Sequence, residues 1–279
     1  MNESIRTRIF RFSLTNRQTA CATAFVLLTI YLGTLAPTLF VHDSAELAAG
    51  AMTLGIVHAP GYPVYLLTAH AFTHLPFGDV AYRVNLLSAV STACAVGLLV
   101  WFLLQLRLSK PVASATGFVF GLSFYTWSLS VIAEVYTFQI LVLALLFCGA
   151  WHWREQGDVR AFYLTAWVLG ISAANNLATG LWWGGILVLL VWRASDKRQT
   201  QITRSVLGGA VLAFLFGLAF VLYLPLRSLA DPALNYAGHF DETGTFYPLD
   251  LSQINNLVWY MTGGPFKTLV GSYTPLELI

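Results

Sequence analysis

The sequence contains few charged residues. Only 10% of its 279 residues are Asp, Glu, Lys or Arg, whereas 57% are hydrophobic, and the mean hydropathy is +0.68. A soluble domain of this composition would have almost no polar surface. Several uncharged stretches are long enough to cross a bilayer core about 30 Å thick. The composition therefore predicts an all-α integral membrane protein that contacts membrane lipid and has no nucleic-acid partner.

The sequence also lacks the patterns of a metal centre or a disulfide framework. Its three cysteines, Cys21, Cys94 and Cys148, lie in hydrophobic runs and have no ligand-like spacing. His70 and His74 have the i, i+4 spacing of zinc ligands, but no Glu lies between them as in HExxH. We interpret them as interfacial histidines. No metal ligand and no cofactor is assigned from the sequence.

The positions of the basic residues predict the orientation of the chain. Four arginines precede the uncharged run 20–41, which places the amino terminus in the cytoplasm and indicates an uncleaved signal anchor. Further spans are expected at 85–106, 111–133, 135–153 and 206–226. The run 161–192 is too long for one crossing, and a hairpin at Asn175 and Asn176 would keep both flanking basic clusters inside.

This topology has about seven transmembrane helices. Of the 15 Lys and Arg residues, it leaves only Arg83, Arg227 and Lys267 outside. The first outer loop covers about 42–83, in which 46–54 and 62–75 are expected to form short helices along the membrane. We expect a transmembrane domain over 1–227 and an outer-face tail over 228–279. In a bacterium the chain would lie in the inner membrane with its active face in the periplasm.

Two acids at the start of the outer loop are candidates for function. Asp43 and Glu46 have the spacing of a capping box, in which Asp43 accepts from the first helical turn and Glu46 reaches back to it. Ser, Thr and Gln would cap equally well, and placing them next to lipid costs less free energy than placing two acids there. The sequence leaves capping and function open, and both can be true.

Other polar residues are expected on the same face. The segment from His58 to Pro63 predicts a rigid turn that presents His58 and Tyr62. Glu134 is an isolated acid at an outer turn, where it either interacts with the dipole of the next helix or belongs to the site. Arg83 and Arg227 either anchor to headgroups or bind a phosphate.

Four motifs in order resemble those of a known family. They are Asp43-Ser44-Ala45-Glu46, His58-Ala59-Pro60-Gly61-Tyr62-Pro63, Val84-Asn85-Leu86-Leu87-Ser88-Ala89 and Glu134-Val135-Tyr136; Leu224-Pro225-Leu226-Arg227 with Asn235-Tyr236 follows downstream. Together they resemble the protein O-mannosyltransferase-like membrane family of the glycosyltransferase-C superfamily. The more common family form has Gly in place of Ala45 and Pro in place of Ala59.

The resemblance implies a glycosyltransferase-C-like fold and a membrane glycosyltransferase that moves a sugar, expected to be mannose, from a polyprenyl phosphate to an acceptor hydroxyl. It implies Asp43 as the general base with Glu46 as partner or substitute. Together with the positions described above, this leads us to expect substrate-binding residues at His58, Tyr62, Arg83, Glu134, Tyr136 and Arg227. The acceptor is expected to be a protein, or else a glycolipid or glycan. Relatives often have more spans and a soluble domain, so the chain is either a fragment or a minimal member. The rival class is a non-catalytic transporter or scaffold.

Overall fold

The computed structural model describes residues 14–193 and 203–266, without the side chains of 186–193. The described chain is mostly helical, as the composition predicted. The helices that form the bundle are α1 (Asn16–Thr34), α4 (Val80–Gln105), α5 (Lys110–Gly121), the short α6 (Phe124–Ser130), α7 (Val135–Gln156), α8 (Val159–Asn175), α9 (Leu177–Arg193) and α10 (Arg204–Leu218). A short turn, η1 (Ala219–Leu222), connects α10 to α11 (Tyr223–Leu229).

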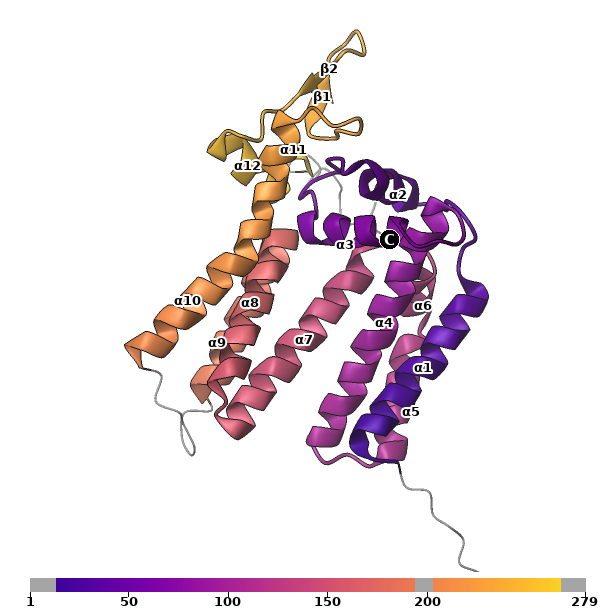
Figure 1. The fold of residues 1–279 in the computed structure, drawn as a ribbon, viewed down its shortest axis with the longest axis vertical. Coiled ribbons are helices and arrows are strands. Elements are labelled where there is room, and N and C mark those ends of the chain that lie inside the picture. The colour runs from indigo at the N-terminus through magenta and orange to yellow at the C-terminus, as the bar shows by residue number, and fades with distance from the viewer. Residues whose placement is uncertain (1–13, 194–202, 267–279) are drawn as a thin grey trace, which may run out of the picture.

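Short elements gather at one end of these helices (Figure 1). They are α2 (Ser44–Thr53), α3 (Pro63–Thr73), α12 (Ile254–Met261), η2 (Gly264–Phe266) and the strands β1 (Gly238–Phe240) and β2 (Phe246–Pro248). The strands form an antiparallel pair with His239 opposite Tyr247, a small departure from the all-α prediction. The two short helices expected in the first outer loop are confirmed as α2 and α3, which lie across the ends of the longer helices (Figure 1).

Three helices in the described residues are long and apolar enough to cross a membrane. They cover Val80–Gln105, Val135–Gln156 and Arg204–Leu229. These helices agree with the class of membrane protein and with three of the seven predicted spans. The other four spans remain predictions.

The segment 111–133, expected to be one continuous span, is broken. Helix α5 ends at Gly121, and the shorter α6 begins at Phe124. The Tyr31 hydroxyl donates to the Gly121 carbonyl over 2.7 Å, and Ser123 has an extended backbone with ψ 148°. The bond from α1 therefore satisfies a carbonyl at the break, which is a contact that the hydropathy of 111–133 does not reveal.

The run 161–192 turns back on itself where the hairpin was expected. Helix α8 ends at Asn175, Asn176 is extended, and α9 begins at Leu177. Gly180 faces the backbone of Ala173, and Gly184 faces Leu169. Because residues further along α9 meet residues further back along α8, the two helices are antiparallel.

The basic ends of the long helices lie away from α2 and α3. The turns from α4 to α5 and from α7 to α8, and the start of α10, share the opposite end of the bundle (Figure 1). These segments carry Arg107, Lys110, Arg154, Arg160 and Arg204. The arrangement is the one that the positive-inside tendency favours if α2 and α3 face outward.

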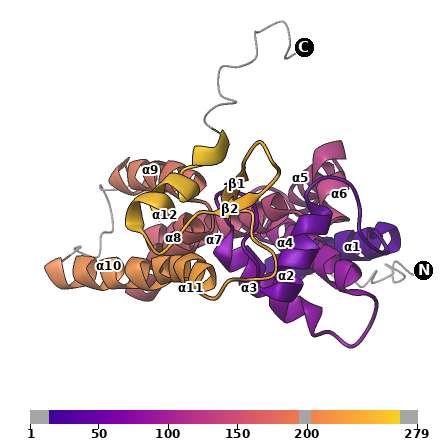
Figure 2. The same ribbon diagram turned by 90° about the horizontal axis from the view of Figure 1, so that it is seen from above.

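The described part of the tail packs onto the segment 42–83, which carries α2 and α3. The Ile56 amide donates to the Leu234 carbonyl over 2.9 Å, and the Tyr236 amide donates to the Ile56 carbonyl over 2.8 Å. Leu251 and Tyr260 are fully buried and belong to the same core as Ile56 and other loop residues. Seen from above, the tail elements lie over the end of the bundle (Figure 2). Sequence reasoning did not foresee this contact between loop and tail.

Candidate active site

The first acid, Asp43, does not cap the helix that follows it. It occupies the N-cap position of α2, but its backbone is in the αR region and its side chain accepts no bond from the first turn. The capping box weighed for Asp43 and Glu46 is therefore absent. The reason is that Glu46 has a different partner, His58, which lies 12 residues further along the chain.

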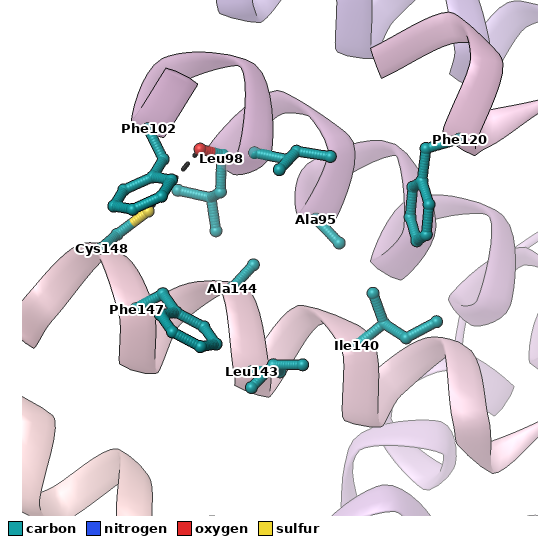
Figure 3. Close-up of a pocket in the computed structure, with 10 residues that line it drawn as sticks. Ala95, Leu98, Phe102, Phe120, Ile140, Leu143, Ala144, Phe147 and Cys148 are labelled. Atoms are coloured by element: carbon teal, nitrogen blue, oxygen red, sulfur yellow. Dashed lines mark hydrogen bonds between the residues drawn. The ribbon is translucent and has the colours of Figure 1, made fainter. Parts of the chain in front are cut away.

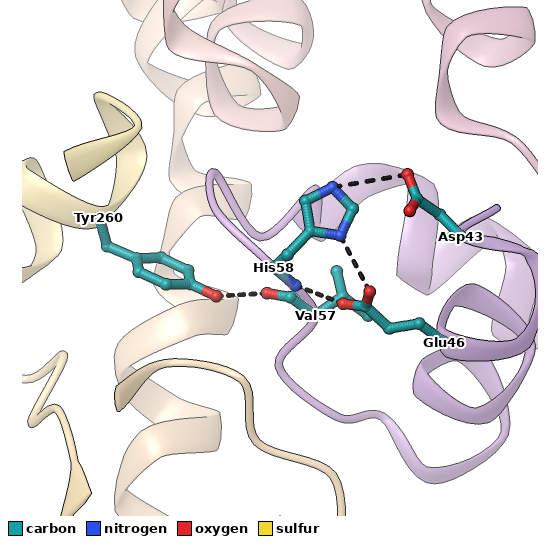
Figure 4. A network of polar contacts seen from close by, with 5 residues as sticks. All are labelled: Asp43, Glu46, Val57, His58 and Tyr260. Atoms are coloured by element: carbon teal, nitrogen blue, oxygen red, sulfur yellow. Dashed lines mark hydrogen bonds and ion pairs between the residues drawn. The ribbon is translucent and has the colours of Figure 1, made fainter. Parts of the chain in front are cut away.

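Glu46 holds His58 by both its main chain and its ring (Figure 4). Oε1 of Glu46 accepts from the His58 amide, and Oε2 lies 3.0 Å from Nδ1 of the ring. These two contacts fix the position and the rotation of the imidazole. Because Nδ1–H is the natural donor to Glu46, Nε2 is left to face the remaining acid.

That remaining acid is Asp43. Its Oδ2 lies 3.8 Å from Nε2 of His58, so the ring stands between two carboxylates (Figure 4). The Asp43 side chain is 42% exposed, compared with 13% for Glu46. Of the two acids, Asp43 is thus the one that a substrate can reach, whereas Glu46 is occupied in orienting His58.

The turn after His58 has the conformation that its sequence requires. The Ala59–Pro60 peptide is cis, and Gly61 has a φ of 87°. A Cβ at Gly61 would lie 2.6 Å from Leu224, so glycine is needed here for both the backbone angle and the space. Tyr62, with φ 41°, is the N-cap residue of α3. The expected turn is present, and it places Tyr62 with its ring centroid 5.4 Å from that of His58.

A tyrosine from the tail supports the turn from the other side. The buried Tyr260 hydroxyl donates to the carbonyl of Val57, the residue before His58 (Figure 4). Tyr260 is separated from this carbonyl by about 200 residues, and no motif near it signals the role. It is one of the residues that sequence reasoning missed.

Glu134 precedes the first residue of α7 and is buried, with 3% of the residue exposed. Its amide donates to the Ser88 hydroxyl over 3.1 Å, and that hydroxyl in turn contacts the Glu134 carbonyl. In the part of the chain that the structure describes, Oε2 of the carboxylate has no hydrogen-bond partner. Ser88 lies in a motif that the sequence singled out, and its role is to fix the main chain that carries Glu134.

The charges of these groups affect one another. The hydrogen bond to Glu46 raises the pKa of His58 against the effect of burial, and the charges of Glu46, Asp43 and Glu134 raise it further. Burial raises the pKa of Glu134, and the charge of Asp43 adds to this rise. The charges of Asp43, His58 and Glu134 therefore act on one another, and the acids favour the protonated form of His58 more than water would.

A pocket of about 310 Å³ opens beside His58. The predicted site residues Tyr62 and Tyr136 both line it, as do Asn176 from the α8–α9 turn and Phe266 from the tail. Tyr136 is 55% exposed. The pocket thus brings together residues from the loop before α3, the start of α7, the α8–α9 turn and the tail.

The two arginines predicted to bind substrate have main-chain partners. Arg83 donates to the carbonyls of Thr73, Phe77 and Gly78 at the end of α3. Arg227 donates to the Leu54 carbonyl over 2.6 Å at the end of α2. Both guanidinium groups satisfy carbonyls at helix ends that would otherwise lack a partner. Their phosphate-binding role stays a prediction, and the structure adds a role in holding α2 and α3.

A second pocket, of about 390 Å³, lies between α4 and α7 (Figure 3). Its lining is apolar and consists of Ala95, Leu98, Leu99, Phe102, Phe120, Ile140, Leu143, Ala144, Phe147 and Cys148. With no acid or base in its wall, it offers nothing for a group-transfer reaction. The candidate site is therefore the polar one around His58.

Comparison with known proteins identifies the family. Residues 43–200 match the family model described as "Protein O-mannosyl-transferase TMEM260 N-terminal domain". The mouse "Protein O-mannosyl-transferase TMEM260" is 35% identical over 199 residues, which are 68% of this chain and 28% of the mouse protein. The Dictyostelium discoideum "Protein O-mannosyl-transferase tmem260" is 26% identical over 171 residues, 58% of this chain and 21% of that protein.

The chain thus spans about a quarter of the length of these curated relatives. No solved structure matches it. The family match begins at Asp43, includes Glu46, His58 and Glu134, and covers more than half of the 279 residues. The chain therefore belongs to the family of TMEM260 N-terminal domains.

Proposed function

We propose that the chain is the membrane part of a protein O-mannosyltransferase, which moves mannose from a polyprenyl phosphate to a hydroxyl group of an acceptor protein. The observation that carries the proposal is the placement of Asp43, half-exposed, against a histidine that Glu46 holds beside an open pocket. The printed names of the mouse and Dictyostelium relatives support the reaction and the class of acceptor.

In this proposal the acceptor oxygen attacks the anomeric carbon of the mannose. A new C–O bond forms, the bond between that carbon and the phosphate oxygen breaks, and polyprenyl phosphate leaves with the bonding electrons. Asp43 takes the proton of the acceptor hydroxyl as general base. Glu46 and His58 hold the polar wall of the site, while Tyr62 and Tyr136 line the space for the sugar.

A lipid-linked donor fits the arrangement of the helices. The site lies at the end of the bundle away from the basic turns (Figure 1), which supports an outward-facing site. Nucleotide sugars are available in the cytoplasm, so an enzyme on the other face needs a donor that the membrane delivers. We extend the proposal to the domains: a transmembrane domain over 1–227 and an outer-face tail over 228–279, whose residues Met261, Thr262, Gly263 and Phe266 line the pocket.

A transfer assay tests the proposal. Membranes that contain the chain are supplied with radiolabelled polyprenyl-phosphate mannose and a peptide rich in Ser and Thr. Label should appear in the peptide above the level of membranes without the chain, and polyprenyl-phosphate glucose should give less. Transfer of label only into the organic-extractable fraction would indicate a glycolipid acceptor. No transfer to either fraction would contradict the proposal.

The orientation gives a separate prediction. After replacement of Cys21, Cys94 and Cys148 by Ala, a cysteine at Glu242 in the β1–β2 turn should react with a membrane-impermeant maleimide on intact cells. A matched cysteine at Glu155, at the basic end of α7, should react only after permeabilisation. Both native side chains are exposed, so accessibility is set by the membrane. Labelling of Glu155→Cys on intact cells would contradict the orientation.

The same method separates the enzyme from a transporter. A transporter with alternating access opens its central site to both sides of the membrane. Tyr136 is exposed in the pocket. If the chain is the proposed enzyme, a cysteine at this position should react with a reagent on the outer side and not with one on the cytoplasmic side. Reaction from the cytoplasmic side as well would favour the transporter.

A further inference from the structure

We propose that Asp43, Glu46 and His58 form a binding site for a divalent transition-metal cation. Nothing in the sequence patterns indicated a metal, because the three residues are not spaced like a known ligand motif. They belong to the N-terminus of α2, its first turn and the loop after it, and the fold brings them together (Figure 4).

The donor atoms have the spacing of a ligand set. One carboxylate oxygen from each acid and one ring nitrogen of His58 all lie within 4.8 Å of one another. Only one ring nitrogen of His58 can bind the ion, and it would do so in place of a proton; Nδ1 lies 3.0 Å from Oε2 of Glu46, and Nε2 lies 3.8 Å from Oδ2 of Asp43. Two ligands that each lie about 2.0–2.2 Å from a metal are separated by about 3–4 Å. The His58 amide holds Oε1 of Glu46 and so turns Oε2 toward the ring.

The balance of charge points in the same direction. Asp43 and Glu46 both lie against the single imidazole of His58, so two acids face one base. Arg83 and Arg227, the two arginines expected near the site, donate to carbonyls at the ends of α3 and α2. Even with His58 protonated, the group is negative. A bound divalent cation would compensate these charges.

Glu134 supplies an independent observation. The residue is 3% exposed, and Oε2 has no hydrogen-bond partner within residues 14–193 and 203–266. A buried carboxylate is costly without a partner of opposite charge or a proton. Tyr136, two residues further along α7, lines the same pocket as His58, so Glu134 lies at the end of α7 that faces the group. A cation held by Asp43, Glu46 and His58 would stabilise the Glu134 carboxylate as well.

The ligand types indicate which cations would bind. Two carboxylates and one imidazole suit Mn²⁺, Fe²⁺ or Zn²⁺, whereas Ca²⁺ and Mg²⁺ prefer oxygen ligands alone. Three protein ligands leave coordination positions open, and His58 lies in the wall of the pocket. The second part of the inference rests on the proposed function: through these positions the cation would hold the donor phosphate, which three bare carboxylates would repel.

This assignment is compatible with Asp43 as general base. A carboxylate has two oxygens, and Oδ2 is the one that faces His58. With Oδ2 on the cation, Oδ1 can take the proton from the acceptor hydroxyl. The metal and the base would then share one side chain without competing for one atom.

The test measures binding of the metal alone. The purified chain in detergent is treated with EDTA, desalted and titrated with MnCl₂, and free Mn²⁺ is followed by electron paramagnetic resonance. We expect one bound Mn²⁺ per chain. Glu46→Gln and His58→Gln should each weaken binding at least 10-fold, as losses of metal-site residues commonly do. Mg²⁺ at equal concentration should displace little of the Mn²⁺.

Matched controls are Glu242→Gln and His74→Gln, which remove an exposed acid and an exposed histidine elsewhere. Both should bind Mn²⁺ like the unchanged chain, and thermal unfolding without metal checks that each variant is folded. Absence of Mn²⁺ binding, or equal binding by the folded Glu46→Gln and His58→Gln variants, would overturn the site. Binding without mannose transfer would count against the proposed function alone, and full transfer by EDTA-treated protein would overturn the role of the cation in the reaction.

Discussion

Replacing Asp43 by Asn is expected to lower mannose transfer about 10²- to 10⁴-fold, the usual contribution of a general base. The amide has nearly the shape of the carboxylate but cannot take a proton from the acceptor. The side chain is 42% exposed and caps no helix, so the folded structure should be unaffected. Initial rates with polyprenyl-phosphate mannose and a Ser/Thr peptide measure the effect.

Two variants make this result specific to Asp43. Glu242→Gln removes an acid from the same face of the protein but outside the site, and it should transfer mannose at the unchanged rate. Glu46→Gln keeps an oxygen that can accept from the His58 amide, so it should lower transfer less than Asp43→Asn does. Near-normal transfer by Asp43→Asn, with thermal unfolding unchanged, would remove Asp43 from the role of base.

Replacing Gly217 by Ala is expected to give the largest loss of stability among single methyl additions in α10. Helices α8 and α10 cross where Gly170 and Gly217 face each other's backbones. A Cβ at Gly217 would lie 2.2 Å from the Trp167 carbonyl oxygen and 2.9 Å from the Ile171 nitrogen. Both atoms belong to the backbone of α8 and cannot move unless the whole helix moves, so α8 and α10 must separate. Overpacking of this kind costs about 1–3 kcal/mol, and small residues at such contacts are typical of membrane helices.

The same helix contains a control. Gly208 also lies within α10, but a Cβ there would meet nothing within 4 Å. Gly208→Ala should leave the midpoint of thermal unfolding unchanged or raise it, since Ala is favoured over Gly inside a helix by up to about 1 kcal/mol. The measurement is the midpoint of thermal unfolding of each variant in detergent, compared with that of the unchanged chain. Equal midpoints for Gly217→Ala and Gly208→Ala would mean that the α8–α10 contact does not contribute as the geometry implies.

Local features of the sequence were sufficient to predict much of the fold. Hydrophobic runs predicted the helices at 85–106 and 135–153, because a helix that meets lipid must be apolar along its length. Asn175 and Asn176 marked the α8–α9 turn, and Pro60 with Gly61 marked the turn after His58. Each of these features depends on residues next to one another in the chain.

The break between α5 and α6 could not be predicted in this way. Hydropathy averages over a whole run, whereas the break coincides with a bond from Tyr31 to Gly121 across 90 residues. The same limit applies to the capping box. The spacing of Asp43 and Glu46 fits such a box, but in the structure Glu46 bonds to His58 instead. Local spacing identifies possible partners, but it does not rank them against distant ones.

The sequence by itself determined that this chain is a helical membrane protein and which polar residues stand out against its apolar background. Isolated acids such as Asp43, Glu46 and Glu134 are costly near lipid, so their presence alone signals a site. Only the tertiary structure decided how these residues are arranged. His58 stands between two acids, Arg83 and Arg227 hold helix ends, and Tyr260 supports the loop. These contacts depend on distances between segments far apart in the chain, which no local pattern contains.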